Sequence, residues 1–430
     1  MSMIWIGALA ILVLLALLAW RLPVAIALVL VSFVGLWTSF GWAPAWGTLK
    51  SAPFEFAASW TLSSVPMFLL MGYVSYHAGI TTGLFNLAKA LFGRLPGSLA
   101  ISSTLACTGF AAMCGSSIAT AAAMGRIAIP EMVKVGYNRN FACGAIAAGG
   151  TIGALIPPSI IMIVYGVFAQ VSIIRLFLAG IGIGLATAAS YILVILIGAW
   201  LRPGSVPRQL DPSFVPQLKP ALLETAPILL ILAGVFGGLF GGIFTATEAG
   251  AVGALLSLIY AAGKRVLTRE ILLRSLADTI TTCGSIFLIG VGATMLTRLL
   301  SLTGLGSQIS ALVDGLELSY WQLMAIIVLI YLILGMFLDA FGAMLITLPI
   351  FTPILHAYGI DMVFFGVFLV KMLEIGMITP PVGMNVYVIK GVVGNLTTLN
   401  GVFRGILPFL FADMVVIVLL ISFPTIMVLG

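Results

Sequence analysis

Two long apolar stretches of the sequence are interrupted by small polar residues whose oxygen atoms suit a hard cation. Gly115-Ser116-Ser117 stands in the middle of residues 96–130, and Asp339-Ala340-Phe341-Gly342 stands in the middle of residues 321–353. Hydroxyl, carbonyl and carboxylate oxygens are the ligands that hard cations prefer. The alternative is that each hydroxyl bonds to its own helix backbone or to a neighbouring helix, which is the commoner role of a single hydroxyl in a membrane.

Each stretch is followed by a second interruption, and the two interruptions have similar sequences. Ile152-Gly153-Ala154-Leu155-Ile156-Pro157-Pro158 matches Ile375-Gly376-Met377-Ile378-Thr379-Pro380-Pro381 at an offset of 223 residues, which also separates Pro130 from Pro353. Proline lacks a backbone donor and clashes with the preceding turn, so a Pro-Pro pair predicts a break in a helix. Carbonyl groups freed at membrane depth are tolerated only where they are buried or line a cavity. Although glycine and proline are common in membrane helices, the shared offset favours an internal repeat that builds one binding site.

Charged residues inside the apolar stretches are functional candidates because they are costly in a membrane. Asp339 is expected to face a cation, a proton or a polar substrate, or else to cap the second arm of its hairpin. Arg126 is a candidate for an anionic substrate, but extension of its side chain to the cytoplasmic surface is favoured. Lys371 and Glu374 are three residues apart on one helix face, and we expect them to pair with each other in a structural role.

The composition defines the class of protein. Of the 430 residues, 62 % are hydrophobic and 7 % are charged, which excludes a soluble globular protein and a disordered chain. Since a spanning helix needs about 20 apolar residues, the chain has room for about ten crossings and is expected to be an all-α polytopic membrane protein. The net charge of +6 is interpreted as an orientation signal and not as a nucleic-acid surface. No nucleotide-binding motif and no nucleophile–base pair is recognisable, so neither an ATPase nor an enzyme is indicated.

Basic residues cluster in two loops, which predicts the orientation of the chain. The first loop, residues 201–220, carries Arg202, Arg208 and Lys219, and the second carries Lys264, Arg265, Arg269 and Arg274. Because Lys- and Arg-rich loops stay in the cytoplasm, both loops are expected there, with two spans between them and both termini in the periplasm. Basic residues flank residues 96–130 and acidic residues flank residues 321–353. The two stretches are therefore expected to be re-entrant hairpins that enter from opposite faces.

The interrupted segments also resemble a known family. Residues 149–159 and 374–385, with their Gly-x-x-x-Pro-Pro cores, look like the large membrane subunit of tripartite ATP-independent periplasmic (TRAP) transporters, the DctM/SiaM family. Gly115-Ser116-Ser117-Ile118-Ala119-Thr120 and Phe337-Leu338-Asp339 resemble the hairpin tips of that family. The likeness extends over almost the whole chain. It implies an elevator-type transporter with an inverted repeat, in the bacterial inner membrane.

The same resemblance implies a function and partners. A periplasmic binding protein would deliver an organic acid of the C4-dicarboxylate or sialic acid type, and uptake would be coupled to Na⁺ at two or more sites. A small four-helix membrane subunit is expected as a separate chain, and membrane lipid surrounds both. The alternative is an H⁺-coupled exchanger or an ion channel on the same fold, with Asp339 as the proton carrier.

The candidate ligands fall at the tips and breaks. For Na⁺ they are Gly115, Ser116, Ser117, Gly153, Ile156, Pro157, Asp339, Gly342, Gly376, Thr379 and Pro380. For the substrate they are Ser117, Thr120, Arg126, Ser159, Asp339 and Asn385.

The expected organisation has five parts. Residues 1–76 and 181–275 would form a scaffold, and residues 406–430 a C-terminal span. Residues 77–180 would form the first transport repeat, with a hairpin at about 96–130 and a broken helix at about 141–170. Residues 276–405 would form the second, with a hairpin at about 321–355 and a broken helix at about 362–395.

Overall fold

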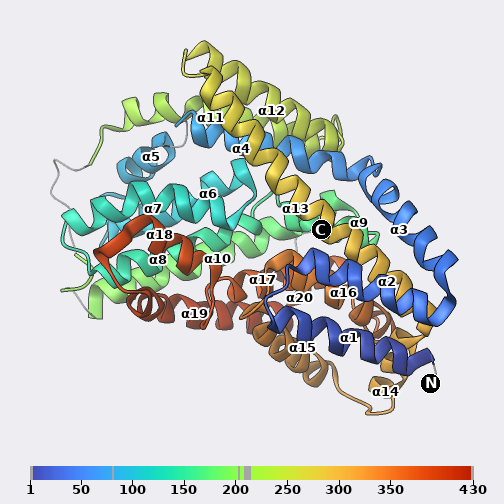
Figure 1. Ribbon diagram of the computed structural model, residues 1–430. Helices are drawn as coiled ribbons and strands as arrows, with labels where there is room; N and C mark the ends of the chain where they lie inside the picture. Colours follow the sequence, from blue (N-terminus) through green and yellow to red (C-terminus); the bar gives the residue numbers. More distant parts are fainter. Residues whose placement is uncertain (1–2, 80–81, 202–203, 208–214, 428–430) are drawn as a thin grey trace.

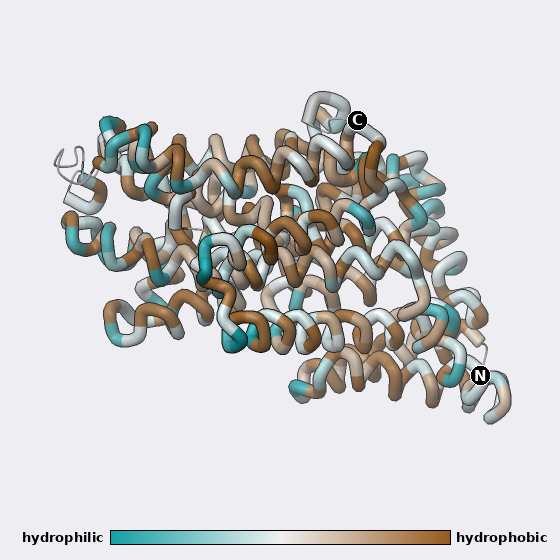
Figure 2. The backbone as a smooth tube through the Cα atoms, turned by 90° about the horizontal axis from the view of Figure 1, so that it is seen from above, coloured by the Kyte–Doolittle hydropathy of each residue, from teal (hydrophilic) through white to brown (hydrophobic). Residues whose placement is uncertain are grey.

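The computed structural model describes residues 3–79, 82–201, 204–207 and 215–427. Arg202 and Arg208 of the first basic loop lie outside these residues. The described residues are helical and contain no strand, which confirms the all-α prediction. Hydrophobic residues predominate along the helices, and many of the hydrophilic residues lie at helix ends (Figure 2).

One group of helices includes the longest helix, α13 (Arg269–Thr303). Its members are α1 (Met3–Ala19), α2 (Val24–Phe40), α3 (Trp42–Ala57), α4 (Ser64–His77), α11 (Leu218–Phe240) and α12 (Ala246–Gly263). Helix α13 contacts α2, α3 and α4, and α12 joins α4 to α11. In Figure 1, α13 runs diagonally from the side of α11 and α12 toward α2.

The first half of the remaining chain folds into a hairpin followed by an interrupted helix. Its elements are α5 (Thr82–Phe92), α6 (Ser98–Cys114), α7 (Ser117–Lys134), α8 (Arg139–Thr151), η2 (Ile152–Ala154), α9 (Ile160–Ala169) and α10 (Ile173–Leu201). Gly115 ends α6 in the left-handed conformation, with φ of +58°, which glycine adopts without a steric penalty. Ser116 then caps α7, so hairpin 1 (α6 and α7) turns at the predicted residues.

The last part of the chain contains a second hairpin and a second interrupted helix. Its elements are α14 (Leu305–Asp314), α15 (Tyr320–Gly335), α16 (Ala340–Ala357), α17 (Met362–Gly376), α18 (Met384–Val393), η4 (Gly394–Leu396), α19 (Leu399–Ser422) and α20 (Pro424–Met427). Asp339 is the N-cap of α16, so hairpin 2 (α15 and α16) turns where the sequence is interrupted. Every residue of α17 is buried, so this helix is enclosed by protein on all sides.

Each hairpin packs closely against the helix break that follows it. A Cβ atom on Gly115 would lie 1.9 Å from the carbonyl oxygen of Pro158, and one on Gly335 would lie 2.8 Å from Cα of Gly376. Distances this short leave room for glycine only. The Pro157–Pro158 and Pro380–Pro381 peptide bonds at the two breaks are cis.

The number of long apolar helices is smaller than the expected ten crossings. Among the described residues, six helices are long and apolar enough to cross a membrane, or seven if α3 and the bent segment that follows it form one span. Five shorter apolar helices stand beside these in the described part of the chain: α1 and α2, of 17 residues each, and α6, α9 and α15, which belong to the hairpins and the first interrupted helix.

Candidate functional site

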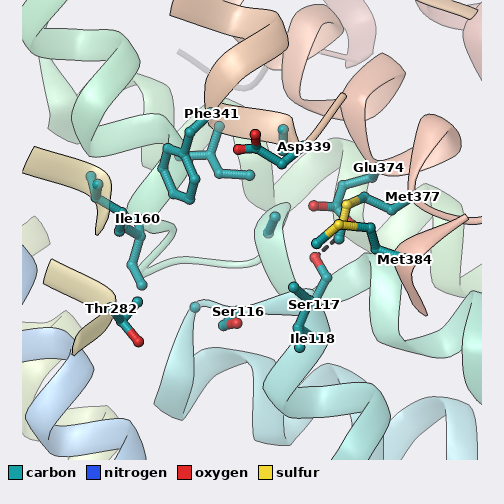
Figure 3. Close-up of a pocket in the computed structure, with 15 residues that line it drawn as sticks. Ser116, Ser117, Ile118, Ile160, Thr282, Asp339, Phe341, Glu374, Met377 and Met384 are labelled. Carbon is teal, nitrogen blue, oxygen red and sulfur yellow. Dashed lines mark hydrogen bonds between the residues drawn. The ribbon is translucent and has the colours of Figure 1, made fainter. Parts of the chain in front are cut away.

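The two hairpin tips and the two interrupted helices meet at one cavity of about 150 Å³. Helix α13 supplies the remaining wall through Thr282 and Ile286. Figure 3 shows Ser116 and Ser117 on one side of the cavity, Asp339 and Phe341 on another, and Glu374 with Met377 and Met384 beside Ser117. The lining residues are Gly115, Ser116, Ser117, Ile118, Ala154, Ile160, Ile161, Thr282, Ile286, Asp339, Ala340, Phe341, Glu374, Met377 and Met384.

Both hairpin tips present a helix N-terminus to this cavity. Ser116 Oγ accepts a hydrogen bond from the backbone N–H of Ala119 at 3.4 Å. Asp339 Oδ2 accepts one from the N–H of Gly342 at 3.1 Å. The capping role that the sequence offered for Asp339 is therefore present, and the carboxylate also lines the cavity.

A hydrogen bond joins the tip of hairpin 1 to α17 across the cavity wall. Ser117 Oγ donates to Glu374 Oε2 at 2.5 Å, although the two residues are 257 positions apart. The second carboxylate oxygen, Glu374 Oε1, is buried without a hydrogen-bond partner. Glu374 is fully buried, so a carboxylate oxygen with spare acceptor capacity stands at the site.

The predicted pairing of Lys371 with Glu374 is wrong. Lys371 Nζ instead forms an ion pair with Asp413 Oδ1 of α19 at 2.5 Å, and both side chains are fully buried. Tyr191 of α10 donates to Asp413 Oδ1 at 2.9 Å and to Oδ2 at 2.8 Å, and Thr151 Oγ1 lies 3.1 Å from the Tyr191 hydroxyl. This buried cluster connects α17, α19, α10 and the end of α8.

Four of the predicted site residues line the cavity: Gly115, Ser116, Ser117 and Asp339. Others lie directly behind it. A Cβ on Gly153 would be 3.0 Å from Thr120 Oγ1 and 3.1 Å from the Ser116 carbonyl, so Gly153 and Thr120 support the tip. Gly342 donates its N–H to Asp339, and Gly376 contacts Gly335.

The remaining predicted residues do not reach the cavity lining. Thr379 Oγ1 donates to the carbonyl of Ile375 at 2.6 Å, and Ser159 caps α9. Asn385 is buried and donates to the carbonyl of Ala147 at 3.4 Å. Arg126 is exposed on α7. Ile156, Pro157 and Pro380 belong to the breaks without forming the cavity wall.

The positions of Glu374 in the cavity wall and of Asp413 in the buried ion pair were not predicted from the sequence. Both are acids in apolar segments, a signal that marks functional candidates in membranes. Glu374 also stands two residues before Gly376, at the second break. Because Glu374 was expected to pair with Lys371 on the same helix, it was not included among the candidate site residues.

The donor set of the cavity fits a hard cation. Ser116, Ser117, Asp339 and Glu374 offer only oxygen atoms, and one of these, Glu374 Oε1, has no other partner. Oxygen donors are the preference of such ions. These residues, together with the carbonyl groups at the breaks, are the ones that would hold it.

The fold is shared with a solved membrane transporter. The crystal structure of the YdaH transporter of Alcanivorax borkumensis matches with a TM-score of 0.63 and 14 % sequence identity, over 96 % of this chain and 99 % of that one. This likeness concerns the fold alone.

Sequence comparisons define the family. Residues 11–426 match the model of the tripartite ATP-independent periplasmic transporter, DctM component. The C4-dicarboxylate TRAP transporter large permease protein DctM of Pseudomonas aeruginosa is 34 % identical over 87 % of this chain and 86 % of its own length. The sialic acid large permease SiaM of Vibrio cholerae is 33 % identical over 85 % of each chain. The chain therefore belongs to the DctM family of TRAP transporter large permeases, multi-pass proteins of the bacterial inner membrane.

Proposed function

We propose that this chain carries an organic acid across the inner membrane together with Na⁺. The observation that carries the proposal is the convergence of two hairpin tips and two interrupted helices on one cavity with oxygen ligands. Interrupted helices in corresponding halves are typical of ion and substrate sites in secondary transporters. The hydroxyl groups of Ser116 and Ser117 contribute to a Na⁺ site in the first repeat, with Gly153 and Pro157. The carboxylate of Asp339 contributes to one in the second repeat, with Gly342, Gly376 and Thr379.

The substrate belongs to the class of small organic anions. Relatives are named for C4-dicarboxylates and sialic acid, and a third, from Oleidesulfovibrio alaskensis, is named for isethionate and is 33 % identical over 78 % of this chain. All three are anions. The partners are a small membrane subunit and a periplasmic binding protein, as the tripartite family implies.

Transport proceeds by an elevator motion of an inverted repeat. The repeats, residues 77–180 and 276–405, move with the cavity, whereas residues 1–76 and 181–275 form the scaffold and 406–430 the C-terminal span. One observation supports the assignment of each hairpin and its break to the same moving unit, because each hairpin packs on its own break.

Na⁺ is expected to stabilise the purified protein, and Ser117→Ala and Asp339→Ala are expected to weaken this effect. A ligand that binds only the folded state adds about 2.7 kcal/mol at a concentration 100 times its Kd. Loss of one oxygen ligand, worth about 1.4 kcal/mol, would weaken apparent Na⁺ affinity about tenfold. The measurement is the Tm of the chain with its small partner in NaCl, KCl and choline chloride.

Ser307→Ala and Asp314→Ala are the matched controls, because both residues are exposed on α14. They are expected to keep the full response to Na⁺. Equal Tm values in the three salts would contradict Na⁺ coupling and favour the H⁺-coupled alternative, in which pH and not Na⁺ drives uptake into proteoliposomes.

A further inference from the structure

The wall of the cavity carries acidic side chains that would repel an organic anion. Two carboxylates, Asp339 and Glu374, stand in its wall, and the lining includes no lysine and no arginine. An organic anion that enters such a site meets like charge in a medium of low dielectric constant, where repulsion is strong. Positive charge must therefore enter before the anion or with it.

The nearest buried cation is not available to compensate Glu374. Lys371 lies one helical turn before it on α17, but its ammonium group is 2.5 Å from Asp413 Oδ1. The Tyr191 hydroxyl, which has one proton to donate, also lies within hydrogen-bond distance of both oxygens of this carboxylate. Lys371 and Asp413 thus neutralise each other, so an ionised Glu374 has no ion-pair partner among the residues that the structure describes.

The two oxygens of Glu374 have different surroundings. Oε2 accepts the 2.5 Å hydrogen bond from Ser117, which fixes the carboxylate against hairpin 1. Oε1 is buried, lies on a cavity-lining residue and has no hydrogen-bond partner. An uncompensated buried acceptor is costly, and nearby oxygen atoms make a small cation its natural partner.

We infer that Glu374 Oε1, with Ser117 Oγ, binds a further monovalent cation that bridges the two halves of the chain. Ser117 belongs to the tip of hairpin 1 and Glu374 to α17, so this site requires both halves. The hydroxyl that donates to Oε2 still has lone pairs to offer the ion. The site is additional to those proposed within each repeat, and it rests on the proposed function for the identity of the ion as Na⁺.

Glu374→Gln is the sharpest test because glutamine keeps the length of the side chain and an oxygen that accepts from Ser117. The experiment measures equilibrium binding of ²²Na⁺ to the purified chain with its small partner, without substrate. The wild type is expected to bind at least three ions, and Glu374→Gln one ion fewer, with the other sites changed less than about twofold. Ser117→Ala is expected to weaken two sites, the one in the first repeat and the bridging site. Glu317→Gln, an exposed acid, is the control and should match the wild type.

The outcomes separate this inference from the proposed function. Unchanged stoichiometry and affinity in Glu374→Gln would overturn the bridging site while leaving Na⁺ coupling intact. Absence of Na⁺ binding in the wild type would overturn both. If Glu374→Gln fails to fold, the wild-type stoichiometry decides: two ions or fewer would contradict a third site.

Discussion

Replacing Lys371 by methionine is expected to destabilise the folded protein by about 3–5 kcal/mol, because Asp413 would keep a buried charge with no counter-ion. The pair is 2.5 Å long and fully buried at both ends. In addition, the ammonium group lies 5.8 Å from the centre of the Tyr191 ring. Thermal unfolding of the detergent-purified protein measures the effect as a fall in Tm.

An exposed pair of the same length provides the control. Arg274 and Glu270 are also 2.5 Å apart, but their side chains are 66 % and 68 % exposed. Breaking this pair with Arg274→Ala is expected to cost less than about 1 kcal/mol. The double replacement Lys371→Met and Asp413→Asn should recover most of the lost stability, since it removes both charges and keeps an acceptor for Tyr191. Equal effects of Lys371→Met and Arg274→Ala would contradict the role of burial.

Gly115→Ala is expected to abolish the response to Na⁺ by displacing the tip of hairpin 1. Its Cβ would lie 1.9 Å from the Pro158 carbonyl oxygen, a backbone atom that cannot rotate away. The adjacent Ser116 and Ser117 line the cavity, so relief of the clash moves both ligands. The measurements are the Na⁺-dependent rise in Tm and the uptake of organic anions by proteoliposomes, normalised to the amount of protein.

Gly136→Ala separates this clash from backbone strain. Gly136 also has a positive φ, +95°, but a Cβ there meets nothing within 4 Å. Gly136→Ala is expected to lower the free energy of unfolding by about 1–2 kcal/mol, the cost of left-handed backbone for a residue with a Cβ atom. It should keep its response to Na⁺. If Gly115→Ala behaves like Gly136→Ala, the close packing of the tip on the break is not required for binding.

The sequence was most informative where the backbone itself must change direction. Gly115, Asp339 and the two Pro-Pro pairs have local reasons to end or break a helix, and local rules identify such positions without knowledge of the rest of the fold. The division of the long apolar stretches into shorter helices follows from the same residues.

The partners of buried charges were not predictable in this way. Spacing placed Lys371 and Glu374 on one helix face, but α17 is buried on every side, so each charge could find a partner on a different neighbour. Asp413 and Ser117 are 42 and 257 positions away from their partners. Which of them comes within hydrogen-bond distance depends on the packing of α7, α17 and α19, which no local pattern encodes.

The Lys371–Asp413 pair also imposes an order on the synthesis and assembly of the protein. The ribosome makes Lys371 42 residues before Asp413, a delay of about 2–8 s at typical elongation rates. Throughout this interval α17 carries an ammonium group that costs about 2.5–3.5 kcal/mol at the centre of an inserted helix. Helix α17 is therefore expected to reach its buried position only after Asp413 of α19 has been made.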